Sequence, residues 1–323
     1  MIVVTGSAGF IGRNLVELLN RNGFYELILV DSYDNSQPKK DSLKNLIYHI
    51  TVDRSNFFSW AENNQEYVDF VFHLGARTDT METDHKIFDH LNLDFSKKMW
   101  AFCSENDIPL LYASSAATFG NGSLGFKNGF EDVEKYQPLN QYAISKNEFD
   151  KWVKIQTSTP PRWAGFKFFN VYGPGESHKE RMASVVWHSF NSVRKFGEMT
   201  LFKSHRSEFS DGQQARDFIH VSDVVEVCLK WMKDGYSGLF NLGTGKAETF
   251  NHLSECVFQS LGREKKVNWV ETPEKIRDGY QYFTQADMSW MTKFKFSHSF
   301  IPLSEGINQY IDFLKTQGPS SDI

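Results

Sequence analysis

The chain has 323 residues, a formal net charge of −5 and no basic run or stripe. This length suffices for one large domain or two intimate ones, and the mixed charges argue against a nucleic-acid partner. The apolar runs stay far below the roughly 20 residues that a membrane helix needs, and the chain opens on a strand-like segment, so we expect no signal peptide and no membrane partner.

The cysteines indicate the redox environment. Cys103, Cys228 and Cys256 are scattered, odd in number and without a CxxC spacing. This pattern argues against a disulfide framework. We therefore expect a reducing, cytoplasmic compartment, and we expect no metal site.

Short apolar runs alternate with amphipathic segments of helical length in the first half of the chain. The expected strands are Ile2–Thr5, Leu27–Asp31, Val68–Leu74, Ile108–Ser114 and Trp163–Asn170, and the expected helices are Ile11–Asn22, Asp84–Glu105 and Gln141–Ile155. Near-continuous apolar strands separated by helices predict a parallel sheet that is covered on both faces. The predicted fold class is therefore α/β, with a doubly wound Rossmann sheet.

The alternation loosens after residue 170, where turns and longer loops become frequent. We expect residues 1–170 to form an NAD(P)-binding Rossmann domain, with 217–245 returning to it. Residues 171–216 and 246–323 should form a smaller C-terminal, substrate-binding lobe. The polar stretch 204–215 is expected to be a mobile loop.

The first strand runs into Thr-Gly-Ser-Ala-Gly-Phe-Ile-Gly, which places Gly6, Gly9 and Gly12 where a strand turns into a helix. This spacing allows a tight turn, close approach of the backbone to a pyrophosphate, and close packing of helix on strand. Asp31 closes the next strand, about 20 residues on, where a carboxylate can bind ribose hydroxyls. Together these residues predict a dinucleotide site.

The choice of nicotinamide cofactor stays open at this point. Asp31 alone favours NAD, because its charge repels a 2′-phosphate. Ser32 beside it and the downstream Lys39 and Lys40 would favour NADP if they bind that phosphate, but the lysines fit a solvated loop equally well.

Residues 142–146 read Tyr-Ala-Ile-Ser-Lys, so Tyr142 and Lys146 share one face of a helix. A tyrosine has an ordinary pKa of about 10, and a nearby ammonium favours its phenolate. The pair is therefore a candidate acid and base. Ser115, which ends a strand at the same edge of the sheet, is a candidate partner for a substrate hydroxyl or carbonyl.

These residues resemble the extended short-chain dehydrogenase/reductase superfamily, which includes nucleotide-sugar epimerases and dehydratases. Further pieces of the resemblance are His-Leu-Gly-Ala at 73–76, Asn-Val-Tyr-Gly-Pro at 170–174, Arg-Asp-Phe-Ile-His-Val at 216–221 and Phe-Asn-Leu-Gly-Thr-Gly at 240–245. The resemblance covers nearly the whole chain.

Within that superfamily, His178-Lys179, followed by Met-Ala-Ser at 182–184 and by His188, is similar to the ADP-L-glycero-D-manno-heptose 6-epimerase family. The segments 114–118 and 283–287 match the same family. The resemblance implies an NADP-dependent isomerase that acts on an ADP-linked heptose in lipopolysaccharide core biosynthesis. It also implies a cytoplasmic homo-oligomer, typically a pentamer.

The implied reaction inverts C6 of the heptose, whose C–H bond is not acidic. Transient oxidation to a 6-keto intermediate, followed by return of hydride to the opposite face, avoids direct deprotonation. The two epimeric hydroxyls point in opposite directions, so each needs its own proton partner. Tyr142 serves one orientation, and the resemblance assigns the other to Lys179. A neutral Lys179 needs a lowered pKa, whereas Glu176 and Glu180 would raise it if they lie close.

The resemblance implies the remaining site residues. The cofactor set adds Phe10, Ile11, Leu74, Gly75, Ala76, Arg77, Thr78, Asn92, Val171 and Lys179 to Gly6, Gly9, Gly12, Asp31, Ser32, Lys39, Tyr142 and Lys146. The substrate set is Ser115, Asn170, Arg181, His188, Phe202, Arg216 and Tyr280, in which the fork of Arg216 suits a diphosphate.

Two features depart from the family pattern. Glu180-Arg181 stands where small residues are usual, which puts the sugar contact of Arg181 in doubt, and the loop 204–215 is longer than usual. The alternatives are another enzyme of the superfamily, such as a 4-epimerase or reductase, and a non-catalytic NAD(P)-binding sensor. A 4,6-dehydratase would want acidic residues at Ala116-Ala117, a 4-epimerase would not need Lys179, and a sensor would not need Tyr142 and Lys146.

Overall fold

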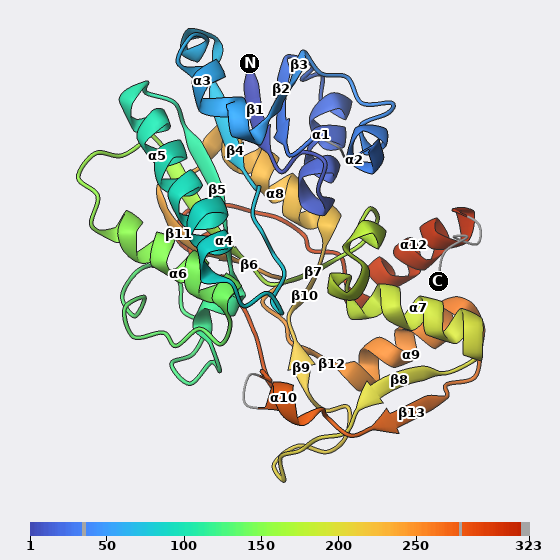
Figure 1. The fold of residues 1–323 in the computed structure, drawn as a ribbon. Coiled ribbons are helices and arrows are strands. Elements are labelled where there is room, and N and C mark those ends of the chain that lie inside the picture. The colour runs from blue at the N-terminus through green and yellow to red at the C-terminus, as the bar shows by residue number, and fades with distance from the viewer. Residues whose placement is uncertain (34–36, 278–279, 318–323) are drawn as a thin grey trace.

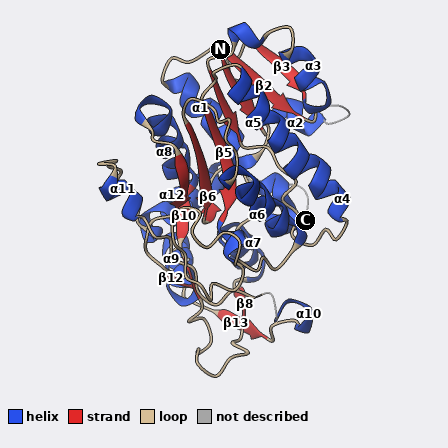
Figure 2. Ribbon diagram, turned by 90° about the vertical axis from the view of Figure 1, so that its left-hand side faces the viewer, coloured by secondary structure: helices blue, strands red, loops and turns tan. Residues whose placement is uncertain are grey.

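A parallel sheet forms the centre of the molecule (Figures 1 and 2). The computed structural model describes residues 1–33, 37–277 and 280–317. The seven strands of the sheet, in the order β11-β6-β5-β4-β1-β2-β3, are β1 (Ile2–Thr5), β2 (Leu27–Asp31), β3 (Ile50–Asp53), β4 (Phe70–His73), β5 (Leu110–Ser115), β6 (Trp163–Phe168) and β11 (Gly238–Leu242).

Helices cover both faces of this sheet because its apolar side chains alternate between two cores. Val4 packs in a core with helices α1 (Phe10–Arg21) and α8 (Val221–Asp234), whereas its neighbour Val3 packs with α3 (Phe57–Ala61), α5 (Phe95–Glu105) and α6 (Gln141–Lys154). Near-continuous apolar strands are what such double coverage requires. The predicted doubly wound α/β fold is confirmed.

The strand order reverses direction at β1. From β1 the chain builds outward to β2 and β3 on one side, and then returns to place β4, β5, β6 and β11 on the other. In open α/β sheets, ligands bind outside the carboxyl ends of the strands at such a switch point. The ends of β1 and β4, at Thr5 and His73, are therefore where a ligand is expected.

The strand expected over Trp163–Asn170 is divided: β6 ends at Phe168, and Asn170 begins β7 (Asn170–Tyr172), which pairs with β10 (Phe218–His220) outside the main sheet. Two other elements also differ from the expectation. The predicted helix over 84–105 consists of α4 (His85–Phe88), a π-helical turn η3 (Asp89–Asp94) and α5. Strand β3 is an addition at the sheet edge, where its first two residues are exposed and its apolar signal is correspondingly weak. Both differences lie beside the ligand site.

The second half of the chain forms a smaller apolar core. Part of this half extends below the main sheet in Figure 2. Its main elements are α7 (Val185–Phe196), α9 (Phe250–Leu261), α12 (Leu303–Thr316) and the strand pairs β7 (Asn170–Tyr172) with β10 (Phe218–His220), β8 (Met199–Phe202) with β13 (Val267–Val270), and β9 (Ala215–Arg216) with β12 (Glu248–Thr249). Shorter elements are α2 (Gln37–Ser42), α10 (Glu274–Arg277), α11 (Ser289–Lys293), and the 3-10 turns η1 (Arg54–Asn56), η2 (Gln65–Tyr67), η4 (Ala116–Phe119) and η5 (Ser177–Met182).

Two elements from the second half of the chain, α8 and β11, belong to the main sheet and its covering helices. Helix α8 packs on α1, and β11 pairs with β6 at the edge of the sheet. In the described ranges, no helix combines the length and the apolar character that crossing a membrane requires.

Candidate active site

The glycine loop after β1 is shaped by close backbone contacts. Gly6 has a φ of +68°, and a Cβ there would lie 2.7 Å from the Cα of Gly75, which follows β4. A Cβ on Gly12 would lie 2.1 Å from the carbonyl oxygen of Gly6. Only glycine fits such contacts, so the loop keeps its backbone open to a ligand at the switch point.

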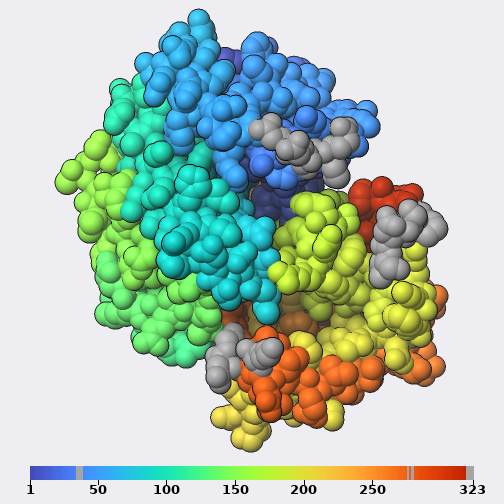
Figure 3. Space-filling view, viewed as in Figure 1, coloured from blue at the N-terminus to red at the C-terminus, as the bar shows by residue number. Residues whose placement is uncertain are grey.

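A cavity of about 660 Å³ opens at this loop. Figure 3 shows the dark blue glycine loop at the bottom of a hollow between the blue, cyan and yellow-green parts of the chain. Its lining includes the predicted residues Gly6, Gly9, Phe10, Ile11, Gly12, Asp31, Lys39, Leu74, Gly75, Ala76, Arg77, Thr78, Lys179 and Arg181. Lysine and arginine side chains outnumber carboxylates in this lining, which suits a ligand with several phosphates. The glycine cradle and these cations fit a nicotinamide dinucleotide.

Asp31 is fixed at the end of β2 by three donors. Its carboxylate accepts hydrogen bonds from the backbone of Ala8 at 3.1 Å and of Ser32 at 2.8 Å, and it pairs with the Lys39 ammonium at 2.5 Å. Arg54, at the end of the neighbouring strand β3, lines the same end of the cavity. Sequence reasoning missed Arg54, although it follows Asp53 at the carboxyl end of a strand.

Asn92 supports the wall of the cavity. Its side chain accepts a hydrogen bond from the Arg77 backbone N–H at 2.8 Å and donates to the Arg77 carbonyl at 3.0 Å and to the Ser145 hydroxyl at 2.9 Å. It lies in the π-helical turn η3, a geometry that occurs often at functional sites. Asn92 therefore shapes the loop after β4. It is not among the residues that line the cavity, and neither are Ser32, Val171, Tyr142 and Lys146, which were also predicted to bind the cofactor.

Tyr142, Ser115 and Lys146 meet at the carboxyl end of β5. The Ser115 hydroxyl acts on the Tyr142 phenol and lowers its pKa, and Lys146 donates to the Ala113 carbonyl at 2.7 Å. Burial raises the pKa of Tyr142, which Ser115 opposes, and burial lowers the pKa of Lys146 to about 8. Asn140 caps the N-terminus of α6, the helix that carries both residues, and its side chain accepts a hydrogen bond from the Ala143 N–H.

The segment 177–182 crosses one side of the cavity. Lys179 lies over the Phe10 ring, with 5.5 Å between its ammonium and the ring centroid. Glu180 has a φ of +47°, which is strained for a residue with a side chain. Arg181 is paired with Asp79 at 2.6 Å, so it faces the loop after β4. Because its guanidinium is bound to Asp79, Arg181 is not free in this structure to contact a sugar.

Two opposing effects act on the pKa of Lys179, namely its burial and the nearby carboxylate of Glu176. Burial lowers the pKa of Lys179, and Glu176 acts in the opposite direction without reversing the shift. Glu176 is itself fully buried and accepts bonds from the backbone and hydroxyl of Ser184, both at 2.6 Å, and it is hydrogen-bonded to Tyr310. Its charge is thus shared among other donors.

Arg216 forms a second polar centre in the smaller lobe. It is buried, with 7% of its surface exposed, and no carboxylate pairs with it in the described part of the chain. Its guanidinium stacks on Tyr280 at 5.4 Å and Phe250 at 5.8 Å, and burial lowers its pKa to about 10. A buried cation without an anion is a ready site for a phosphate group.

The other predicted substrate residues are distributed around Arg216 and β7. Phe202 packs edge-on against Tyr280, Asn170 is exposed at the start of β7, and His188 is exposed on α7. The loop 204–215 packs on Tyr282 through His205 and Phe209. Among the described residues, no group of three or more His, Cys, Asp and Glu side chains gathers to hold a metal ion.

Asp217 connects the strand that bears Arg216 with the loops at residues 244–245 and 286. Its buried carboxylate accepts hydrogen bonds from the backbone of Thr244, Gly245 and Ala286 at 2.7 to 3.0 Å. The backbone carbonyl of Asp217 accepts from Asn170. Asp217 therefore fixes the strand beside Arg216 to the loops that follow β11.

Comparison with known proteins supports one family. The family model described as the NAD dependent epimerase/dehydratase family matches residues 2–243. A Fusobacterium nucleatum protein named ADP-L-glycero-D-manno-heptose-6-epimerase is 38% identical over 322 residues, covering 96% of this chain and 97% of that relative. A Brachyspira hyodysenteriae protein of the same name is 36% identical and covers 98% of this chain and 99% of its own length.

Solved structures agree with this assignment. The Helicobacter pylori ADP-L-glycero-D-manno-heptose-6-epimerase matches with a TM-score of 0.79 and 25% identity, over 97% of this chain and 96% of that one. A UDP-N-acetylglucosamine 4-epimerase from Methanobrevibacter ruminantium matches with a TM-score of 0.80 and 22% identity, over 98% of both chains, and shows the shared fold. The chain therefore belongs to the NAD-dependent epimerase/dehydratase family, and within it to the group of the ADP-L-glycero-D-manno-heptose-6-epimerases.

Proposed function

We propose that this protein inverts C6 of the heptose in ADP-D-glycero-D-manno-heptose and so forms the L-glycero epimer. The observation that supports the proposal is that two ionisable groups lie on separate segments, Tyr142 with Lys146 on α6 and Lys179 on the segment 177–182. An epimerisation through a ketone needs one such group for each hydroxyl orientation. The names of the relatives, at 36% and 38% identity over nearly the full length, support the same substrate.

A nicotinamide dinucleotide held by the glycine loop would supply the hydride acceptor and donor. Tyr142 exchanges a proton with one hydroxyl epimer, and the Lys146 ammonium beside it favours the phenolate. Ser115, which acts on that phenol, orients the reacting oxygen. Lys179 exchanges a proton with the other epimer, and burial makes its neutral form accessible by lowering its pKa.

We further propose NADP as the cofactor. Asp31 is paired with Lys39, so the charge that would repel a 2′-phosphate is compensated. Arg54 brings a second cation to the same end of the cavity. The diphosphate of the sugar nucleotide is assigned to Arg216. A cytoplasmic homo-oligomer that acts in lipopolysaccharide precursor synthesis is proposed from the family resemblance.

The test is turnover of ADP-D-glycero-D-manno-heptose followed by proton NMR without added cofactor. Wild type should form the L-epimer, and Lys179→Ala should be suppressed by about 10²–10⁴-fold, the usual contribution of a proton-transfer group. Lys195→Ala, which removes an exposed lysine from α7, is the matched control. Equal turnover by Lys179→Ala would make Lys179 a solvated charge, and no turnover by wild type with NADP or NAD supplied would reject the heptose substrate.

A further inference from the structure

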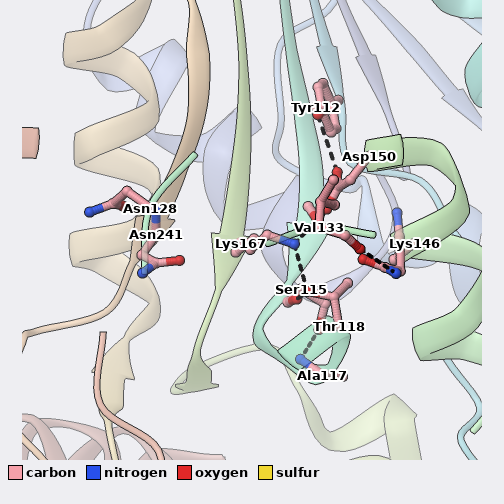
Figure 4. Close-up of polar contacts among 12 residues, drawn as sticks. Tyr112, Ser115, Ala117, Thr118, Asn128, Val133, Lys146, Asp150, Lys167 and Asn241 are labelled. Atoms are coloured by element: carbon pink, nitrogen blue, oxygen red, sulfur yellow. Dashed lines mark hydrogen bonds and ion pairs between the residues drawn. The ribbon is translucent and has the colours of Figure 1, made fainter. Parts of the chain in front are cut away.

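A buried ion pair lies directly below the Tyr142–Lys146 pair. Lys167 on β6 has 1% of its surface exposed, and Asp150 on α6 is fully buried. The Lys167 ammonium contacts the Asp150 carboxylate at 2.6 Å (Figure 4). Asp150 follows Lys146 by one helical turn, so Tyr142, Lys146 and Asp150 lie along one face of α6.

The pair is tied to the strand end that bears Ser115. Lys167 also donates to the Thr118 hydroxyl at 2.6 Å, and Thr118 donates to the Ser115 carbonyl at 2.8 Å. The hydroxyl of Ser114 donates to Asp150 at 2.7 Å. The network thus holds the side chain that precedes Ser115 and the carbonyl of Ser115 itself.

Stability alone is a weak reason for such a pair. Removing two charges from water is costly, and replacing a buried ion pair by apolar residues of similar volume is often neutral or stabilising. Lys167 lies on β6 between the buried Phe166 and Phe168, which point to the opposite face of the sheet, and its cross-strand neighbours are Ser114 and Asn241. The ion pair is therefore better explained by a contribution to the adjacent site that holds Tyr142 and Lys146.

The groups around Asp150 indicate what this contribution is. Lys167 on β6, Tyr112 on β5, and Lys146 and Tyr142 on α6 all interact with its charge, as does Tyr136 from the loop before α6. His73, which faces Lys146 from β4, is held neutral at ordinary pH because burial lowers its pKa to about 3. The charge of Asp150 acts to raise the pKa of both Tyr142 and Lys146, and the Lys167 ammonium that contacts Asp150 opposes this effect.

We propose that Lys167 is a positioning residue of the catalytic site, which holds Ser115 in place and offsets the charge of Asp150 next to the Tyr142–Lys146 pair by binding Asp150 and Thr118 at once. The proposal rests on the proposed role of Tyr142 as a proton-exchanging group. Lys167 itself does not touch substrate. Lys167 offsets the charge of Asp150 through an ion pair, and it fixes the strand end through its hydrogen bond to Thr118.

The test compares Lys167→Met, Asp150→Asn and the double variant. Each is measured by the pH dependence of kcat and by ultraviolet difference spectra of tyrosinate formation taken against Tyr142→Phe. In Lys167→Met the uncompensated Asp150 should move the ionisation of the Tyr142–Lys146 pair upward by about one pH unit and lower kcat by up to about 100-fold. The double variant, which removes both charges, should return the ionisation to within a few tenths of wild type.

Controls separate this effect from lost stability. Leu111→Ala removes a buried side chain from β5 without changing a charge, so it should lower Tm and leave the ionisation in place. If Lys167→Met does not fold, Thr118→Val removes the hydroxyl that links Lys167 to the Ser115 carbonyl but leaves the Lys167–Asp150 ion pair, so it should lower kcat without moving the ionisation. An unchanged ionisation in Lys167→Met, or an unchanged kcat in Thr118→Val, would overturn the proposal. Full activity of Tyr142→Phe would instead reject the assigned role of Tyr142.

Discussion

Replacing Arg216 by methionine should make the ligand-free protein more stable and its nucleotide affinity weaker. Burial lowers the pKa of Arg216 from 12.5 to about 10, and one pKa unit corresponds to 1.36 kcal/mol. The buried guanidinium therefore costs about 3 kcal/mol at pH 7, which lies below both values. Stacking on Tyr280 and Phe250 offsets about 0.5–1 kcal/mol for each ring. The two rings together offset about 1–2 kcal/mol, so removal of the guanidinium should stabilise the free protein by about 1–2 kcal/mol.

The same substitution should weaken ADP binding. Hydrogen bonds to a charged group contribute about 1.5–3 kcal/mol, which corresponds to a Kd about 10- to 150-fold higher. Thermal unfolding without ligand and calorimetric titration with ADP measure the two effects. A gain of 1 kcal/mol corresponds to a Tm rise of about 2 °C for a chain of this size.

Arg162 provides the matched control. It stacks on Trp231 at 5.4 Å and donates to the Lys233 carbonyl at 3.1 Å, far along the chain from Arg216. Arg162→Met should lower Tm and leave the ADP affinity unchanged. A less stable Arg216→Met with wild-type ADP affinity would refute the reasoning, because Arg216 would then be a structural residue.

Three further substitutions test the cofactor cavity. Gly12→Ala places a Cβ 2.1 Å from the carbonyl oxygen of Gly6, so cofactor titration should show lost binding and unfolding a lower Tm; normal binding would mean that the loop is not the cradle. Lys39→Met removes the cation beside Asp31 and should weaken NADP by about tenfold or more while affecting NAD less; equal losses for both cofactors would contradict a 2′-phosphate contact. Arg181→Ala breaks an ion pair in which the arginine is exposed, and since such pairs contribute about 0–1 kcal/mol, cofactor release in stopped-flow measurements should accelerate by no more than about fivefold. A much larger acceleration would show that Arg181 holds the cofactor directly.

The sheet and the glycine loop were predictable because their signals are local. Strands β1 and β2 have the expected bounds, since uninterrupted apolar residues are buried on both faces. The glycine spacing and the separation of Tyr142 from Lys146 express geometry over a few residues. These patterns identify a fold and a pair of residues without any knowledge of distant contacts.

The rest of the site depends on contacts between remote segments. Arg181 meets Asp79 across 102 residues, and nothing near either residue in the sequence indicates the other. Lys167 stands in an apolar strand, where a single lysine gives no sign of the carboxylate that it binds on α6. The competition between burial and Glu176 at Lys179 is likewise decided by packing, because the sequence places the carboxylate nearby but does not say that Ser184 and other donors share its charge.

Lys179 lies on the segment 177–182, so a movement of this segment during cofactor exchange would also move Lys179. The same short segment lines the cofactor cavity and pairs with the loop after β4 through Arg181. If that segment lifts to exchange cofactor, it takes Lys179 away with it, so exchange and epimerisation exclude each other. The proposed reaction returns its hydride within each turnover, so the cofactor need not be exchanged between turnovers. The rate of epimerisation should therefore not depend on the ratio of oxidised to reduced cofactor in solution.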